Sequence, residues 1–388
     1  MGAMLLVLTL FACSPTRTGN RSEVETTDDV DSALRIAPRY AKGFTVKYLK
    51  DGVRLVEVSD PQADEDDRMP IGYAFALVPR GSETEVPEGY ERVEVPIRST
   101  ITMTALQLSN FTALRAHDFI RGITGTKSLY NKDILKRVGD GSIQKIGMEG
   151  NFDTEMVMAA NPQVIFISPS KRGGYDAIKE TGITLIPHLG YKEPTPLGQA
   201  EWIKFVSLFI GREAEANEVF QGIERRYNGL KQRVDSLLAS PTGNEGEAVP
   251  TVFSGEMHGG NWYAVGGRNH LAQMFRDAGA DYIIHDDNTG GMNLEYEQLY
   301  ATAANADYWR ILNSFPGQFS YEALLASEPR NALFKAFRER HVIYCNMRQT
   351  PYYESAPVEP DQVLADLVAV FHPELLPGHE GKYYQLLK

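Results

Sequence analysis

The chain of 388 residues is long for a single hydrophobic core, so two domains are expected. Hydrophobic residues make up 43% of the chain and charged residues 23%, as in an ordinary globular protein. The formal net charge of -12 argues against a nucleic-acid partner, because binding to phosphates requires a basic surface.

The first residues have the pattern of a secretion signal. An apolar run from Met4 to Ala12 is too short to span a bilayer and is followed directly by Cys13. Such a run before Leu-x-small-Cys resembles a lipoprotein signal peptide, in which the cysteine is lipidated. We therefore expect residues 1–13 to be a signal peptide and Cys13 to carry lipid; in the alternative, Cys13 is incidental. The polar residues 14–37 predict a flexible tether.

The folded part is predicted to begin with strands and then to alternate. Apolar residues alternate on both sides of Lys50-Asp51-Gly52, which predicts a β-hairpin. From Ser99 onward strands and helices alternate, and Val164–Ile167 is a continuous apolar run typical of a strand buried on both faces. This alternation predicts an α/β fold with mostly parallel sheets.

A long helix is predicted in the middle of the chain. Apolar residues from Ala216 to Leu238 keep a 3.6-residue period, after a first helix that opens at Thr195-Pro196. Strand-helix alternation restarts at Thr251, so the long helix predicts a spine between two lobes; a surface helix of one domain is the alternative. The expected domains are 38–195 (first lobe with its hairpin), 196–240 (helical pair with the spine) and 250–388 (second lobe).

Four segments, taken in order, carry a resemblance to a known family: Arg92–Thr102, Lys145–Phe166, Tyr263–His270 and Asn293–Asp307. From about Phe44 onward the chain resembles the helical-backbone class of periplasmic substrate-binding proteins of ABC importers, which includes iron-siderophore, haem and cobalamin binders. The resemblance implies two Rossmann-like lobes joined by a single long backbone helix.

The resemblance also implies a function. The protein would be a lipid-anchored periplasmic monomer and not an enzyme. It would capture an iron chelate (siderophore or haem) or cobalamin in the interlobe cleft, as cargo and not as a cofactor, and deliver it to the ABC-transporter permease. One acidic residue of each lobe would pair with arginines of the permease, Glu155 in the first lobe and Glu297 or Glu295 in the second.

The loops at the carboxyl ends of the strands are the candidate ligand contacts. They combine aromatic side chains, glycines and cations, which suits a large planar or macrocyclic ligand. For Trp262 and Tyr263, packing in the lobe core is the alternative. The expected ligand-binding residues are Ser99, Thr100, Arg172, Tyr191, Trp262, Tyr263, Arg268, Arg348 and Tyr352.

Two other functions stay open. His188, His258, His270 and His285 lie in or near the candidate loops and predict, as an alternative, a bare zinc or manganese site in the same fold. One of them could also be an axial ligand of haem or cobalamin. The sequence has no Gly-x-Ser-x-Gly, Walker or His-Glu-x-x-His motif, so a chelate-processing hydrolase is the remaining enzyme alternative.

Overall fold

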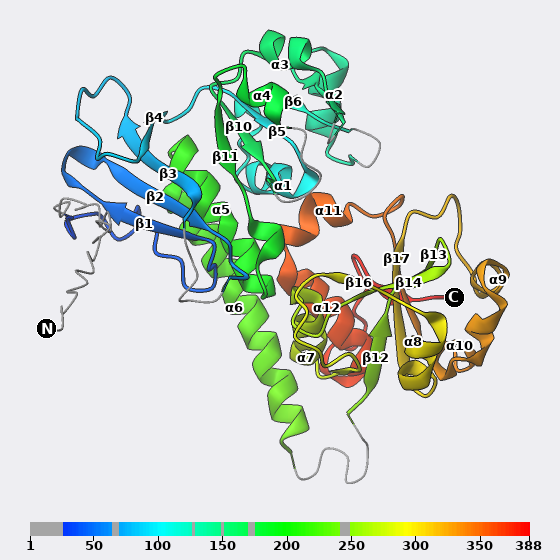
Figure 1. The fold of residues 1–388 in the computed structure, drawn as a ribbon. Coiled ribbons are helices and arrows are strands. Elements are labelled where there is room, and N and C mark those ends of the chain that lie inside the picture. The colour runs from blue at the N-terminus through cyan, green and yellow to red at the C-terminus, as the bar shows by residue number, and fades with distance from the viewer. Residues whose placement is uncertain (1–25, 64–69, 126–128, 149–150, 170–174, 241–248) are drawn as a thin grey trace, which may run out of the picture.

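The computed structural model describes residues 26–63, 70–125, 129–148, 151–169, 175–240 and 249–388. They form an N-terminal sheet and two α/β lobes, which are joined by two consecutive helices (Figure 1). The predicted α/β class, with two lobes of mostly parallel sheet, is confirmed. In the described part of the chain, every helix is too short or too polar to cross a bilayer.

The N-terminal sheet contains the predicted hairpin and two further strands. The first three strands are antiparallel, and the fourth pairs in parallel with the third. On each strand every second residue points into the first-lobe core, as the two-residue period of a strand requires; examples are Phe44 on the first strand, Val58 on the second and Leu77 on the third. The strands are β1 (Phe44–Tyr48), β2 (Arg54–Ser59), β3 (Pro70–Pro79) and β4 (Glu91–Val95).

The first lobe is a parallel sheet with strand order β11-β10-β5-β6-β7. Its strands are β5 (Thr100–Thr102), β6 (Ile120–Ile123), β7 (Gln144–Lys145), β10 (Val164–Ile167) and β11 (Thr184–Pro187). The buried apolar run predicted a strand with both faces covered, and all four residues of β10 are indeed buried. The remaining elements are β8 (Gly147–Met148), β9 (Asn151–Phe152), α1 (Ala105–Ala113), α2 (Lys132–Gly139), α3 (Thr154–Ala160) and α4 (Asp176–Lys179).

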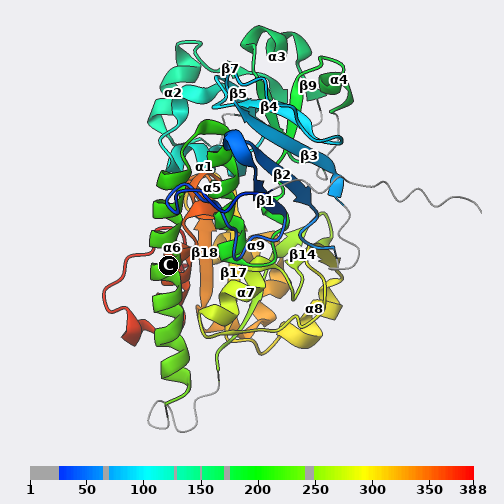
Figure 2. The same cartoon turned by 90° about the vertical axis from the view of Figure 1, so that its left-hand side faces the viewer.

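Helices α5 (Pro196–Ile210) and α6 (Glu213–Leu238) connect the lobes. The Thr195 side chain caps α5, and Gly211, at φ 68°, ends it in the left-handed conformation that favours glycine. With 26 residues, α6 is about 39 Å long. Its first turns pack in the first-lobe core through Phe220, and its later turns pack in the second-lobe core through Tyr227. Figure 2 shows α6 running alongside both lobes. The long helix is therefore a spine shared by both cores.

The second lobe has a five-stranded sheet of order β15-β12-β17-β18-β19, in which only β19 is antiparallel to its neighbour. Its strands are β12 (Thr251–Ser254), β15 (Asp281–Tyr282), β17 (Tyr308–Asn313), β18 (Val342–Asn346) and β19 (Gln385–Leu386). A smaller antiparallel sheet consists of β13 (Glu256–His258), β14 (Asn261–Val265) and β16 (Gly291–Leu294).

Six helices surround these two sheets: α7 (His270–Asp277), α8 (Tyr296–Ala303), α9 (Tyr321–Ser327), α10 (Lys335–Arg338), α11 (Tyr352–Ser355) and α12 (Pro360–Phe371). Short 3-10 helices lie in the connections of both lobes. They are Lys50–Gly52, His117–Phe119, η4 (Gly190–Lys192), Pro329–Leu333, Ala356–Val358 and Pro373–Leu375.

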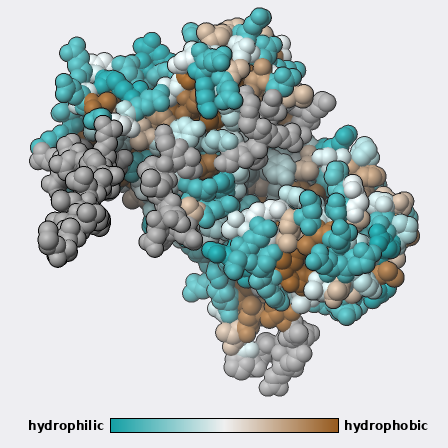
Figure 3. Space-filling view, in the orientation of Figure 1, coloured by the Kyte–Doolittle hydropathy of each residue, from teal (hydrophilic) through white to brown (hydrophobic). Residues whose placement is uncertain are grey.

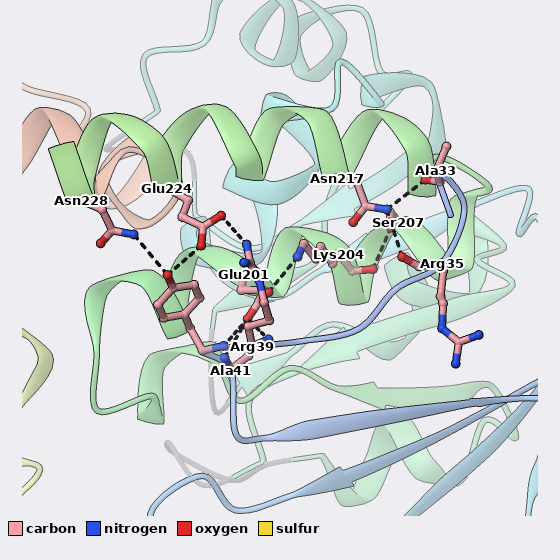
Figure 4. Close-up of polar contacts among 11 residues, drawn as sticks. Ala33, Arg35, Arg39, Ala41, Glu201, Lys204, Ser207, Asn217, Glu224 and Asn228 are labelled. Carbon is pink, nitrogen blue, oxygen red and sulfur yellow. Dashed lines mark hydrogen bonds and ion pairs between the residues drawn. The ribbon is translucent and has the colours of Figure 1, made fainter. Parts of the chain in front are cut away.

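An N-terminal strap, residues 33–43, fastens the N-terminal sheet to α5 and α6 (Figure 4). One carboxylate oxygen of the buried Glu201 accepts the backbone N–H groups of Arg39, Tyr40 and Ala41 at 2.7–2.9 Å. Its other oxygen binds Lys204 Nζ at 2.8 Å. The predicted tether is therefore too long at its C-terminal end, because residues 33–37 belong to this strap and Ile36 is buried in the first-lobe core.

The lobes also meet through α11, which packs against α1 between them (Figure 1). The carboxylate of the buried Glu354 accepts the backbone N–H groups of Tyr130 at 2.6 Å and Asn131 at 2.8 Å. The Tyr130 hydroxyl donates to the carbonyl oxygen of Met347 at 3.0 Å. These contacts fix the first-lobe segment before α2 to the end of the second lobe that faces it.

Candidate ligand-binding site

A cavity of about 420 Å³ lies in the second lobe, at the carboxyl halves of β12 and β17. This is the edge of the sheet at which ligands of open α/β folds bind. The cavity faces the first lobe, because α11 contributes Tyr352 and Tyr353 to its lining and also packs against α1. Figure 3 shows the recess between the two lobes. The polar lining includes Ser254, Glu256, His258, Asn269, His270, Asn293 and Arg310.

A tight turn of the chain forms one wall of the cavity. Gly255 has φ 104°, and a Cβ atom there would lie 1.9 Å from the carbonyl oxygen of Tyr263. Only glycine permits this close approach between the turn and β14. The turn lets β12 end beside the cavity while β14 presents Tyr263 to it.

The cation of the cavity is Arg310, whose side chain is 7% exposed on the central strand β17. Its Nε donates to the Tyr384 hydroxyl at 2.9 Å, and its Nη2 donates to the same oxygen. Among the described residues, no carboxylate lies within the 4.0 Å of an ion pair with this guanidinium. A buried charge without a counterion is unfavourable, so this arrangement is unusual for a purely structural arginine.

Burial shifts the pKa values of two further ionisable side chains of the cavity. Burial, followed by the nearby charge of Arg310, lowers the pKa of His270 to about 4. Burial raises the pKa of Glu256, whose carboxylate accepts a hydrogen bond from Asn313 Nδ2 at 3.1 Å. Among the described lining residues, Arg310 is the only arginine or lysine, so its positive charge is present at any physiological pH.

Aromatic side chains surround the mouth of the cavity. Tyr263 and Tyr353 are 54% and 55% exposed, which is unusual for side chains of this size. Tyr352 packs edge to face against Tyr353 and Tyr384. Exposed phenols beside a polar cavity provide broad contact area together with hydrogen-bonding groups.

Two of the predicted ligand residues, Tyr263 and Tyr352, line this cavity. Trp262 does not, because it is 0% exposed and its indole Nε1 donates to the carbonyl oxygen of Ser254 at 3.0 Å. Successive residues of β14 point to opposite faces, so Trp262 packs against Phe253 and Trp309 while Tyr263 points outward. For Trp262 the core alternative is correct.

The position predicted for Ser99 and Thr100 is wrong. Both lie at the amino end of β5, opposite the expected edge, because the segment 92–102 is divided between β4 and β5. Thr100 is buried and its hydroxyl donates to the carbonyl oxygen of Val164 at 3.1 Å. Ser99 therefore belongs to the turn between β4 and β5, and not to a loop at the carboxyl end of a core strand.

The remaining predicted residues lie outside the cavity. Tyr191, in η4, packs against the first-lobe core. Arg268 and Arg348 are exposed, and the nearest carboxylate to Arg268 is Asp287 at 4.0 Å. Arg172 is not among the described residues, and neither is Cys13.

The corresponding edge of the first lobe is closed by buried polar side chains. Gln107 Nε2 donates to Ser168 Oγ at 3.1 Å, and Asn110 Nδ2 lies 3.3 Å from His188 Nε2. All four side chains are buried. Burial lowers the pKa of His188 to about 3, so its ring is neutral in the folded protein at neutral pH.

The four histidines of the metal alternative lie in different places. His188 is in the first lobe, whereas His258 and His270 line the second-lobe cavity. His285 is exposed and its Nε2 lies 2.8 Å from Asp281. Within the described ranges, no three His, Cys, Asp or Glu side chains are grouped as metal ligands would be.

The candidate docking glutamates lie on short helices near the outer ends of the two lobes (Figure 1). Glu155 is exposed in the first turn of α3. Glu297 is exposed on α8, and its carboxylate lies 3.0 Å from Arg330 Nη1. Glu295 is exposed at the N-cap of α8 without a capping hydrogen bond from its side chain.

Arg310 is not among the residues that the sequence predicts for the site. Arg310 stands within Trp309-Arg310-Ile311, which is a strand pattern with one charged residue. A charged residue inside an otherwise buried strand is the signal that could have found it. Tyr384, its partner, is 74 residues away along the chain and has no local signal of this role.

The sequence pattern of the periplasmic binding protein family matches residues 101–348. The chain belongs to this family. The N-terminal strap and sheet, α11 and the C-terminal segment lie outside the matched residues. A protein of Methanocaldococcus jannaschii described as an uncharacterized lipoprotein is 28% identical over 374 residues, which cover 89% of this chain and 84% of that protein.

Solved structures of similar fold come from bacterial binding proteins. A periplasmic haem-binding protein from Pseudomonas aeruginosa has a TM-score of 0.58 and 17% identity, and the match covers 75% of this chain and 98% of that one. A protein of the ABC-type Fe3+-hydroxamate transport system of Saccharomonospora viridis has a TM-score of 0.53 and 14% identity, with 71% and 94% covered. These similarities confirm the two-lobed binding-protein fold predicted from the sequence.

Proposed function

We propose that the protein is the solute-binding component of an ABC importer and carries an iron chelate, either a siderophore complex or haem, or else a corrinoid. The observation that supports this most is the cavity at the carboxyl ends of the second-lobe strands, which faces the first lobe in a member of a binding-protein family. Similar folds in proteins described as binding haem or transporting ferric hydroxamates support the ligand class.

The chemistry of the cavity also fits a chelate. Large metal chelates present flat or rounded apolar faces together with a few charged groups at their edge. The exposed rings of Tyr263 and Tyr353 suit the faces, and the buried guanidinium of Arg310 suits an acidic group. Closure of the site by the first lobe would exclude water and strengthen these contacts.

Binding to purified protein tests the proposal. Haemin, a ferric hydroxamate and cyanocobalamin are titrated separately, and absorbance and tyrosine and tryptophan fluorescence are recorded. We expect saturable, stoichiometric binding of one of them without conversion to product. Failure to bind all three contradicts the proposal, and tight binding of zinc alone would favour the bare-metal alternative. Turnover of a chelate would favour the hydrolase.

Delivery to the permease is proposed to use Glu155 in the first lobe and Glu295 or Glu297 in the second. Exposed carboxylates set orientation and encounter rate more than affinity. We therefore expect Glu155→Lys to abolish ligand uptake by cells and to leave ligand affinity of the purified protein unchanged. Glu180→Lys, an exposed glutamate of the same lobe, is the matched control and should retain uptake. Normal uptake by the Glu155 variant contradicts this role.

Anchoring through Cys13 is proposed from the signal-like N-terminus, and the M. jannaschii relative described as a lipoprotein supports it. Cells that express the protein are fed a fatty-acid analogue. We expect label on the wild-type protein and none on Cys13→Ser. Equal labelling of the two proteins, or none on either, contradicts the anchor.

A further inference from the structure

We propose that Arg310 anchors a carboxylate group of the ligand and that Tyr384, supplied by the C-terminal segment, is the positioning residue that orients its guanidinium. This inference rests on the proposed function and specifies the chemistry of the ligand. The Arg310 side chain lines the second-lobe cavity, and the Tyr384 hydroxyl accepts its hydrogen bond.

The guanidinium has hydrogen-bonding capacity left for a ligand. Its Nε and Nη2 share one acceptor, the Tyr384 hydroxyl, and its Nη1 has no hydrogen bond to any described residue. An arginine keeps its charge at any physiological pH, so this side chain cannot avoid its desolvation by losing a proton. A carboxylate that enters the cavity would supply the missing counterion and would accept two parallel hydrogen bonds.

Tyr384 is held in place by an unusual carboxylate. Asp366, buried on α12, accepts the backbone N–H groups of Lys382, Tyr383 and Tyr384 at 2.6–3.1 Å. It also binds His379 Nε2 at 2.8 Å. These bonds and the pairing of β19 with β18 bring the C-terminal segment beneath the cavity.

The phenol orients Arg310 without neutralising it. Burial raises the pKa of Tyr384 well above its ordinary value, so the hydroxyl stays uncharged. The guanidinium also lies over the Tyr384 ring, 5.1 Å from its centroid. The pair therefore fixes the direction of the cation and leaves its charge for another group.

The rest of the cavity favours a carboxylate over a more highly charged anion. His270 is neutral at pH 7, and Glu256 adds negative potential to the same cavity. One arginine beside one glutamate in the described lining suits a singly charged group better than a phosphate dianion. Tyr352, Tyr353 and Tyr384 lie beyond residue 348, so this subsite depends on chain outside the segment that matches the family.

Two sources of a carboxylate are distinguished by the choice of probes. A porphyrin is represented by haemin and its dimethyl ester, in which two uncharged methyl esters replace the two propionate carboxylates. A carboxylate-bearing iron chelate is represented by ferric citrate, and a ferric hydroxamate without a carboxylate is its control. We expect the wild-type protein to bind one acidic probe at least about 30-fold more tightly than its uncharged counterpart.

Substitutions of Arg310 and Tyr384 test whether these residues cause the preference for the acidic probe. In Arg310→Met we expect the acidic probe to bind as weakly as its counterpart, so that the discrimination disappears. Tyr384→Phe keeps the ring and should reduce the discrimination roughly three- to tenfold. Arg338→Met removes an exposed arginine of α10, outside the cavity, and should change nothing. If Arg310→Met fails to fold, it is replaced in the test by Tyr384→Phe and by Arg310→Gln, which removes the charge and keeps a polar side chain.

The outcomes separate the two proposals. A wild-type protein that binds a probe without preference for the carboxylate overturns the subsite and leaves the proposed function intact. The same holds if Arg310→Met retains the full preference, or if the foldable variants leave it unchanged. A wild-type protein that binds no chelate at all overturns both.

Discussion

Lys204 on α5 and Arg310 on β17 are both buried cations, but their surroundings differ. Lys204 lies 2.8 Å from the carboxylate of Glu201, which also accepts three backbone N–H groups of the strap. Arg310 has a phenol as partner and no carboxylate among the described residues within ion-pair distance. The first charge is compensated inside the fold, and the second is left for a group from outside. The identity of a buried cation's partner thus separates a structural role from a binding role.

The same contrast holds for the carboxyl edges of the two sheets. In the first lobe the polar side chains of Gln107, Asn110, Ser168 and His188 turn inward and bond to one another. In the second lobe the same edge is open, with exposed tyrosines around a cavity. Among the described residues, a shared α/β architecture therefore carries buried, mutually bonded polar side chains at this edge in one lobe and a cavity in the other.

The largest expected effect concerns the buried ion pair of Lys204 with Glu201. Glu201→Gln leaves the Lys204 ammonium buried beside a neutral amide, and removing one partner of a buried pair costs about 3–5 kcal/mol. We expect the free energy of unfolding, measured by urea denaturation, to fall by about that amount. Glu215→Gln removes an exposed partner of Arg212 and should change it by less than about 1 kcal/mol. Equal effects of the two substitutions would contradict the structural role of the pair.

The second prediction concerns the closed edge of the first lobe. The pKa of His188 is about 3 in the folded protein and about 6.5 when unfolded, so the unfolded state binds more protons between these values. The neutral His188 ring therefore makes its full contribution to the free energy of unfolding above about pH 6.5, and this contribution is lost as the pH falls toward 3. Between pH 7 and pH 4.5 we expect a loss of about 2 kcal/mol from this residue.

Urea denaturation at the two pH values measures this loss. His188→Gln, which cannot titrate, should lose about 2 kcal/mol less than the wild-type protein over the same interval. The comparison uses the difference between two pH values, so a uniform destabilisation by the substitution does not affect it. An identical pH dependence in both proteins would show that His188 does not stay neutral in the fold.

Much of the fold could be predicted from the sequence, because burial imposes periods that can be read along the chain. The spine α6 and the buried strand β10 are examples. The residues of the site are harder to predict from such periods. Trp262 and Tyr263 are neighbouring aromatic residues of one strand, and both are reasonable ligand contacts by composition. Which of them is buried depends on the face of the sheet to which each side chain points. A lone arginine in a strand does not reveal that its counterion is missing, because this depends on segments far apart in the sequence.

The third prediction concerns the free energy of unfolding again, but here the substitution is not expected to lower it. Arg310→Met removes an uncompensated buried cation, and replacing buried charged groups by apolar ones of similar size is often neutral or stabilising. In ligand-free protein we expect the free energy of unfolding to stay the same or to rise by up to about 2 kcal/mol. Urea denaturation of both proteins without ligand checks this. A large loss would mean that Arg310 is a structural residue, like Lys204.

The smallest expected effect concerns the acidic residue that shares the cavity with Arg310. Glu256→Gln removes a negative charge near the proposed carboxylate subsite, so a carboxylate-bearing chelate should bind roughly threefold more tightly at low ionic strength. Asp287→Asn, an exposed acid outside the cavity, is the matched control and should have no effect. Titration of both variants at low and high salt measures the change.

The pH dependence of this effect follows from the burial of Glu256, which raises the pKa of its carboxyl group. As pH falls, Glu256 becomes neutral before an exposed glutamate would, and the wild-type cavity approaches the charge state of the variant. The ratio of the two affinities should therefore decline toward one as pH decreases from neutrality. A ratio that is constant with pH, or tighter binding by the wild-type protein, would mean that Glu256 does not act on the ligand through its charge.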